Sequence, residues 1–268
     1  MMKKIVTYSL LIFAALMMFF PIFYAFSVSF MSSEDILKRS VIPTAPTLQN
    51  YFDVFSSVPI LHYLMNSFIV ASTATIGMLL VSALSAFIFA FVPFRGRQMV
   101  FLLFISTLLI PWEATMIPNF LTIQSFGWMN NYLALTVPFF ALAFGTFLLR
   151  QHFKTVPLEL YEAAQVEGLS KFQFFYKVVV PYAKTSFVTL GIFGFLTTWN
   201  MYLWPLLVTT NDTVRTVQIG LRRLQADEVA TNWGVVMAGV VIVIIPTLIL
   251  LTLGQKQLQK GLTKGALK

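Results

Sequence analysis

The sequence predicts an all-α integral membrane protein with six transmembrane helices. Of its 268 residues, 58% are apolar and 10% are charged, whereas soluble proteins carry roughly a quarter charged residues. Six apolar stretches reach or approach the length of about 20 residues that a helix needs to cross a bilayer. The basic residues gather in the intervals that an even number of spans places on one side of the membrane. These three observations together predict the fold class.

The first predicted span is residues 5–31, which follow Lys3 and Lys4. A cleaved signal peptide is the alternative, because residues 25–27 form a weak cleavage-like triplet. A signal-peptide core is usually about 7–15 residues long, and this apolar run is longer. We therefore expect residues 1–31 to be a retained N-terminal transmembrane helix, in which Pro21 is a candidate kink.

Residues 32–65 contain three prolines and charges of both signs, so we expect an external loop with short amphipathic pieces. Residues 66–260 form the predicted membrane core, and residues 261–268 form a C-terminal tail. In the first span of this core, Ser82, Ala86 and Ala90 recur every four residues, which predicts a face for close helix packing. The five core spans are residues 66–92, 99–118, 132–149, 186–207 and 233–254.

The lysines and arginines predict the orientation of the chain. With both termini, the basic turn at residues 93–97 and the segment 150–184 on one side, that side holds 13 of the 18 basic residues. Cytoplasmic loops carry such an excess of Lys and Arg. We therefore expect both termini to be cytoplasmic, and the net charge of +8 reflects topology better than nucleic-acid binding.

The sequence lacks the residues that metal binding, nucleotide binding and catalysis require. The chain has no cysteine and only two histidines, His62 and His152, far apart in the sequence, so no metal site is expected. It contains no Gly-rich phosphate-binding motif and no catalytic constellation, so no catalytic residue is predicted. Glu113 is the single ionisable residue predicted to lie within the membrane-embedded part of a span. Proton- or sodium-coupled carriers usually place several such groups along their path, so we expect the energy for transport to come from a partner.

A polar stretch, residues 158–182, interrupts the apolar sequence. Pro157 suits the start of a helix, and Gly168 stands where a left-handed cap would end it. Ser170 and Gln173 form a possible capping box for a second helix that runs toward Pro181. Two short helices joined at a glycine are therefore expected.

The spacing within this stretch carries a resemblance. Glu162, Ala163 and Ala164 are followed after three residues by Gly168, and after nine more by Val178, one residue and Val180-Pro181. This resembles the EAA loop of permeases of ABC importers of the carbohydrate group. Val178 and Val180 replace the family's usual Ile and Leu, and Glu167 replaces a more usual Asp, which keeps the chemistry.

The resemblance implies a type I ABC importer permease fold in the bacterial cytoplasmic (inner) membrane, with a cytoplasmic EAA coupling helix in a coupling loop at residues 152–182. It implies that this loop couples to an ATPase through Glu162, Ala163, Ala164, Gly168 and Pro181. The expected partners are a second homologous permease, two ATP-binding cassette subunits, an extracytoplasmic solute-binding protein and the lipid bilayer. ATP and Mg²⁺ would be bound by the ATPase and no cofactor by this chain, which is expected to be a transport subunit and not an enzyme.

In the coupling helix, Leu158, Tyr161, Ala164 and Val166 are expected to be partly buried against the ATPase.

Within the family, four segments look like the sn-glycerol-3-phosphate permease branch: residues 82–87, 111–113, 146–151 and 199–207. Sugar permeases share much of the last segment, so both sugars and glycerol phosphates stay open as solutes. Two rival functions also stay open, a secondary carrier and a membrane scaffold or enzyme, each without an ATPase partner.

The predicted substrate path consists of Glu113, Asn200, Tyr202 and Trp204. Asn200 and Trp204 are four residues apart and are expected to share one helical face, offering an amide and an aromatic surface to a polyol. The alternative is an interfacial aromatic belt. For Glu113, the alternative is that Pro111 and Pro118 end the helix and the carboxylate reaches the outer interface.

Overall fold

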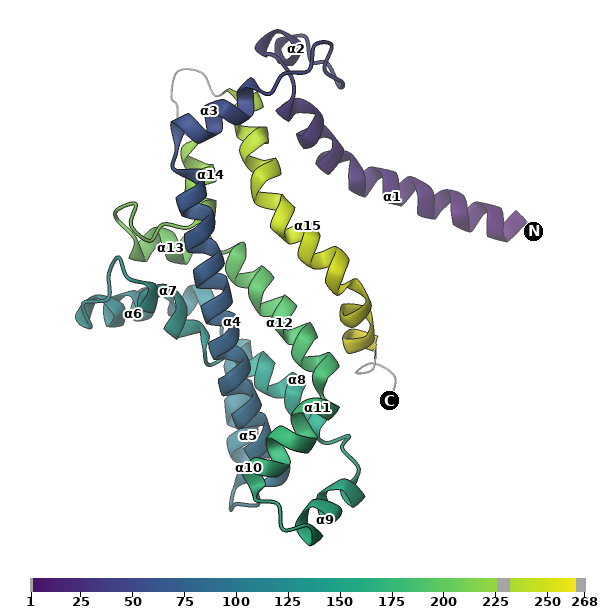
Figure 1. The fold of residues 1–268 in the computed structure, drawn as a ribbon, viewed down its shortest axis with the longest axis vertical. Coiled ribbons are helices and arrows are strands. Elements are labelled where there is room, and N and C mark those ends of the chain that lie inside the picture. Colours follow the sequence, from purple (N-terminus) through teal and green to yellow (C-terminus); the bar gives the residue numbers. More distant parts are fainter. Residues whose placement is uncertain (1, 226–231, 264–268) are drawn as a thin grey trace. The chain divides into compact units, whose positions relative to one another are not determined.

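The computed structural model describes residues 2–225 and 232–263, and most of these are helical (Figure 1). The chain divides into two compact units, which are described separately. The first unit comprises Met1–Met65 and Thr216–Pro246, and the second comprises Asn66–Arg215 and Thr247–Lys268. The division falls within two long helices, α4 (Ile60–Phe91) and α15 (Trp233–Thr263). The end of the predicted tail, residues 264–268, lies outside the described residues.

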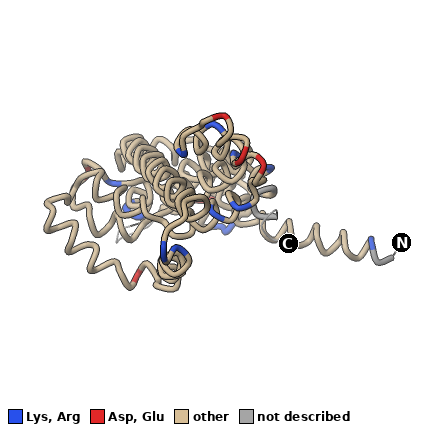
Figure 2. Tube along the Cα trace, turned by 90° about the horizontal axis from the view of Figure 1, so that it is seen from below, with Lys and Arg blue, Asp and Glu red and all other residues tan. Residues whose placement is uncertain are grey.

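In the first unit, α1 (Met2–Ser29) is a continuous helix of 28 residues with Pro21 inside it. At 1.5 Å per residue, its length of about 42 Å is ample for a hydrocarbon core of about 30 Å. Most of its large apolar side chains are exposed in the single chain, and Figure 2 shows no charged residue along it beyond its start. These features fit the predicted first span.

Two short helices, α2 (Ser33–Leu37) and α3 (Gln49–Ser57), follow α1. The Nδ2 of Asn50 donates hydrogen bonds to the carbonyl oxygens of Ser29 and Met31, at 3.0 and 2.8 Å. The hydroxyls of Tyr51 and Ser29 are 2.8 Å apart. α3 is therefore fixed to the end of α1. Because α4 begins at Ile60, residues 60–65, predicted as the end of the loop, are helical.

The polar segment between the fifth and sixth predicted spans, residues 209–232, also contains a helix. It contains α14 (Val217–Arg223), in which Val217, Ile219 and Gly220 are buried. Arg223 Nη1 donates to the hydroxyl of the buried Tyr63, at 2.7 Å. Residues 226–231 of this segment lie outside the described residues.

In the second unit, the third and fourth predicted spans are interrupted. The third consists of α5 (Arg97–Ser106), a 3₁₀ turn η1 (Thr107–Leu109) and α6 (Trp112–Ser125), with a bend of 98°. The fourth consists of α7 (Tyr132–Thr136), η2 (Val137–Phe139) and α8 (Ala143–Phe153), with a bend of 43°. Pro111, which has no N–H and a fixed φ, stands at the first break.

The fifth predicted span, residues 186–207, is not one helix either. α12 (Lys184–Trp199) ends at Asn200, and α13 (Leu203–Val208) begins after Tyr202. Among the described residues, three continuous helices are long and apolar enough to cross a membrane, and six spans result if each bent pair counts as one. The third bent pair joins Lys171–Tyr182 to Lys184–Trp199 at 78°.

The predicted packing face on α4 is confirmed. Ser82 and Ala86 are fully buried, and Ala90 packs against the same apolar cluster. A Cβ added at Gly145 of α8 would lie only 2.5 Å from Ser82 Oγ. The small residues therefore allow α4 and α8 to approach closely.

Candidate coupling loop and translocation path

The first helix of the candidate coupling loop is α9 (Leu158–Val166), which Pro157 caps at its start. Glu159 lies in its first turn, where a carboxylate is favoured by the helix dipole. At the other end, Leu169 N donates to Ala164 O at 2.9 Å and Gly168 N to Gln165 O at 3.0 Å. These two bonds form a Schellman motif. Gly168 has a φ of +71°, so the predicted left-handed cap is confirmed.

The second helix of the loop begins with the predicted capping box. Gln173 N donates to Ser170 Oγ at 3.2 Å, and Ser170 N donates to Gln173 Oε1 at 2.8 Å. α10 (Lys171–Phe174) continues into a π-helical turn, η3 (Phe175–Val179), and α11 (Val180–Tyr182). The π turn, a feature that often marks functional sites, was not predicted.

The faces of α9 differ from the prediction. Ala164 is 5% exposed and belongs to the apolar core of its own unit, and Tyr161 is half-buried beside it. The expected partner-facing set of Leu158, Tyr161, Ala164 and Val166 is therefore wrong for Tyr161 and Ala164, which lie three apart on the inner face. The outer face carries Leu158, Glu162 and Val166, spaced by four residues, and Val166 is 90% exposed. Ala163, Gly168 and Pro181 are also exposed.

An aromatic cluster fixes the loop to the end of α4. The ring of Tyr161 lies 5.1 Å from that of Phe174 and 6.0 Å from that of Phe91, and Phe91 and Phe174 are 5.2 Å apart. Figure 1 shows α9 and α10 at this end of the second unit. These aromatic anchors were not predicted, although Phe87 and Phe91 lie four residues apart, on one face of α4.

A hydrogen bond joins the two ends of the loop. The hydroxyl of Tyr182 donates to Thr155 O at 3.0 Å. The loop is thus fixed at its base as well as at its aromatic anchor, while its outer face stays exposed. A displacement of α9 can therefore be transmitted to α4 through the aromatic cluster. It can also be transmitted to α12, which begins two residues after Tyr182.

Trp204 lies in a packed core. It is 1% exposed, and its Nε1 donates to Ala134 O at 2.8 Å. Trp112 and Phe139 pack edge-on against it, with centroid distances of 5.6 and 6.3 Å. Its indole therefore serves packing in this conformation.

The expected common helical face of Asn200 and Trp204 is wrong, because the helix is interrupted between them. Asn200 caps the end of α12, is exposed, and donates from Nδ2 to Leu196 O at 2.8 Å. Tyr202 precedes α13 and is half-buried. Contact of these residues with a solute stays a prediction.

Glu113 lies in the first turn of α6, directly after the break at Pro111, and is exposed in the single chain. The alternative, in which Pro111 and Pro118 both end the helix, holds for Pro111 but not for Pro118, which lies inside α6. Glu113 is therefore at an interruption and not within a continuous span. Its place along a transport route stays a prediction.

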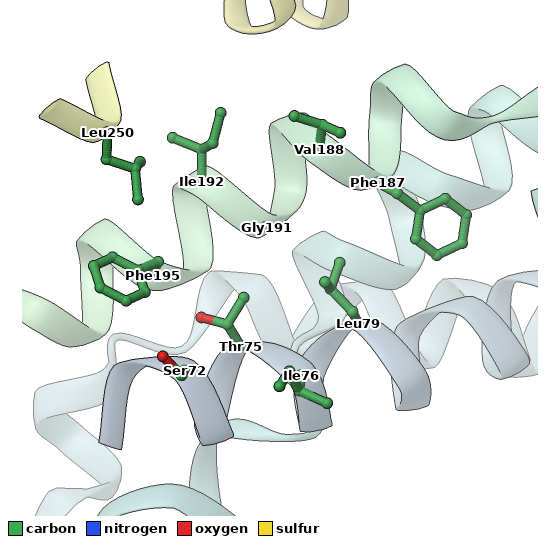
Figure 3. A pocket seen from close by; sticks show the side chains of 10 residues that line it. All are labelled: Ser72, Thr75, Ile76, Leu79, Phe187, Val188, Gly191, Ile192, Phe195 and Leu250. Atoms are coloured by element: carbon green, nitrogen blue, oxygen red, sulfur yellow. The ribbon is translucent and has the colours of Figure 1, made fainter. Parts of the chain in front are cut away.

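The second unit contains an open apolar groove of about 510 Å³ between α4, α12 and Leu250 of α15 (Figure 3). Ser72 and Thr75 supply its hydroxyl groups. A smaller cavity, of about 150 Å³, shares Thr75. Neither is lined by Glu113, Asn200, Tyr202 or Trp204, so the predicted path residues are separate from both.

Two curated relatives are permeases. The chain is 34% identical over 272 residues to the "sn-glycerol-3-phosphate transport system permease protein UgpE" of Rhizobium meliloti (strain 1021), covering 98% of this chain and 96% of the relative. The protein of the same name from Yersinia pestis bv. Antiqua (strain Antiqua) is 33% identical over 262 residues, covering 94% and 93%.

A similar fold is known from a crystal structure of a bacterial ABC transporter involved in the import of the acidic polysaccharide alginate. One of its chains matches with a TM-score of 0.88 at 24% identity, over 95% of this chain and 96% of that chain. A second structure, of a bacterial alginate ABC transporter in complex with an alginate pentasaccharide-bound periplasmic protein, matches with a TM-score of 0.62 at 13% identity, over 95% and 91%.

The family model "Binding-protein-dependent transport system inner membrane component" matches residues 1–264. This match covers nearly the whole chain, and the curated relatives agree with it. The chain therefore belongs to the family of binding-protein-dependent inner-membrane components, the permeases of ABC importers, and is not an enzyme.

Proposed function

We propose that this chain is the transmembrane permease subunit of an ATP-driven, binding-protein-dependent importer for a sugar or a glycerol-phosphate-type solute. The observation that carries the proposal is the capped helix pair α9–α10, fixed by aromatic rings to the end of α4. Such a pair in a membrane permease presents a rigid, exposed face to a partner.

In the proposed mechanism, the row of Leu158, Glu162 and Val166 docks on a cytoplasmic ATPase. The apolar side chains would bury their exposed surface there, and Glu162 would meet a basic group of the partner. Movement of the docked helix would pass through Tyr161 and Phe174 into α4, and through the base of the loop into α12.

One chain has one such loop, so the proposed complex contains a second homologous permease and two ATP-binding cassette subunits. ATP and Mg²⁺ bind to those subunits, and an extracytoplasmic binding protein delivers the solute. Both termini and α9 lie on the cytoplasmic side, as the distribution of Lys and Arg favours.

For the solute, the names of the curated relatives favour glycerol 3-phosphate over a sugar. Glu113, Asn200 and Tyr202 remain the proposed path residues of this chain, since they lie at helix interruptions with polar groups available. Trp204 supports that region by packing. A bare carboxylate at Glu113 would repel a phosphate, so an anionic solute would require a basic residue nearby, from either permease.

The proposal is tested by reconstituting the assembled complex in proteoliposomes and measuring solute uptake with and without ATP. Uptake is expected to require ATP, the ATPase subunits and the binding protein together. Uptake that follows an ion gradient and needs no ATPase would instead favour a secondary carrier. An assembled complex that moves neither sugars nor glycerol phosphates would contradict the proposed solute class.

A further inference from the structure

Three basic residues lie where α4 ends, α5 begins and α8 ends. Arg150 is 3% exposed; its Nε donates to Phe89 O at 3.2 Å and its Nη2 to Gln98 Oε1 at 3.4 Å. Its guanidinium carbon lies 3.6 Å from the centroid of the Phe101 ring, a cation–π contact. Arg150 is therefore held in place by neutral groups alone.

The other two cations are Arg97 and Lys154. Arg97 Nη1 contacts Ala90 O and Val92 O at 3.5 and 3.3 Å, so it caps the negative end of α4. Lys154 follows α8 and is exposed. The backbone N–H of Lys154 donates to Arg150 O at 3.0 Å, so Lys154 lies one helical turn after Arg150, on the same face. Its pKa is lowered by burial of the ammonium group and then by the charges of Arg150 and Arg97.

This cluster has no counter-charge within the described part of the chain. The ion pairs found there are Lys38–Glu34 and Arg215–Asp212. A guanidinium has five N–H donors, and Arg150 uses two of its nitrogens in the hydrogen bonds above. Three like charges at close range are unfavourable unless an anion joins them.

The surface beside the cluster is apolar. In α5, Met99 is 67% exposed, Leu102 57% and Leu103 59%. These side chains follow directly from Arg97 along one short helix. A ligand that satisfies both features carries a negative group for the cations and a hydrocarbon chain for α5.

We propose that Arg97, Arg150 and Lys154 form a binding site for the phosphate of an anionic phospholipid, whose acyl chain lies along the exposed side chains of α5. Basic pockets between transmembrane helices bind such headgroups. Arg150, preorganised by Phe101 and Gln98, provides directed N–H donors, while Lys154 provides a mobile point charge. The site would attach this end of α4 and α8 to the lipid surface.

The test is native mass spectrometry of the purified full-length chain with phosphatidylglycerol or with phosphatidylcholine of identical acyl chains. Two variants are compared with wild type: Lys154→Gln, which removes an exposed cation, and Arg97→Gln with Lys154→Gln. Lys171→Gln with Lys177→Gln is the matched control, because both lysines are exposed and lie elsewhere on the coupling loop. Thermal unfolding of each variant checks that it is folded.

Wild type and the control are expected to retain phosphatidylglycerol over phosphatidylcholine, with retention falling about fivefold for each cluster charge removed. Equal losses in the control and cluster variants would overturn the site. Displacement of the lipid by an equal concentration of inorganic phosphate would show a site for free anions. Complete loss of lipid when the ATPase subunits are added would show that the cations face a protein carboxylate. Either of these two results contradicts the proposal.

Discussion

Tyr161 of α9 and Phe174 of α10 pack edge to face, with ring centroids 5.1 Å apart. The contact holds together two helices separated by the Gly168 turn, and Phe91 of α4 contacts both rings. A force on the exposed face of α9 therefore has a packed route to a long membrane helix. Ala164, which is buried one turn after Tyr161, is the other residue of α9 within this apolar core.

Tyr161→Ala is expected to loosen α9 while the membrane helices stay folded. An aromatic pair contributes about 0.5–1.5 kcal/mol beyond burial of its area, so amide exchange in α9 should rise by about tenfold. ATP-driven uptake should fall. Hydrogen exchange and uptake assays on the assembled complex provide the measurements.

Tyr161→Phe, which keeps the ring, and Tyr176→Ala, which removes an exposed ring of the same loop, serve as controls. Both should behave as wild type. A loss of uptake in Tyr161→Phe equal to that in Tyr161→Ala would mean that the hydroxyl, and not the ring packing, is what matters.

The loss of uptake on substitution of Gly168 should depend on how well the new residue tolerates a positive φ, and not on the size of its side chain. A Cβ at this position meets nothing within 4 Å, but φ is +71°, which costs most L-residues about 1–2 kcal/mol. We expect Gly168→Asn to retain most uptake, since Asn tolerates this region, and the β-branched Gly168→Val to lose it with normal membrane insertion. Equal uptake by the two variants would contradict a conformational role.

Trp204→Phe should lower stability without changing the concentration dependence of uptake. The variant leaves Ala134 O buried without its donor, at a cost of about 1–3 kcal/mol in unfolding free energy. Thermal unfolding and an uptake titration on the same preparation separate the two effects. A changed half-saturation concentration of uptake at unchanged stability would indicate that Trp204 does contact the solute.

The loop that follows α1 should open in acid. Thr44 donates to Asp35 from Oγ1 at 2.6 Å and from its amide at 3.1 Å, and these bonds, the hydroxyl first, lower the pKa of Asp35. Since the folded pKa is depressed, the stabilisation is present above the unfolded value, near pH 4, and is lost as pH falls through the folded pKa. Protection of the Thr44 amide, corrected for intrinsic exchange, should follow this profile. Asp35→Asn should show weaker protection with no such acid step, and an identical step in the variant would refute the assignment.

The sequence predicted local features that depend on one or two residues. Gly168 and the Ser170–Gln173 pair determine their turn and cap by backbone chemistry alone, and the small face at Ser82 and Ala86 follows from helical spacing. All of these are confirmed.

The two predictions that were wrong, for the Asn200–Trp204 face and for Ala164, have a common cause. Helix continuity through residues 200–202 and the inward position of Ala164 depend on contacts with distant segments, such as that between Trp204 and Ala134. Apolar composition alone does not reveal these contacts, because an interrupted span and a continuous span have the same composition.

Docking of α9 on a cytoplasmic ATPase is the central claim, and the chain's lack of cysteine makes a direct test possible. Val166→Cys, at the 90% exposed position of α9, and Leu37→Cys, at an 83% exposed position of α2, would each be labelled with a maleimide photo-cross-linker in membranes that contain the assembled complex. The account predicts that Val166→Cys cross-links to the ATPase subunit and Leu37→Cys does not. A cross-link from Leu37→Cys, or none from Val166→Cys in an assembled complex, would contradict it.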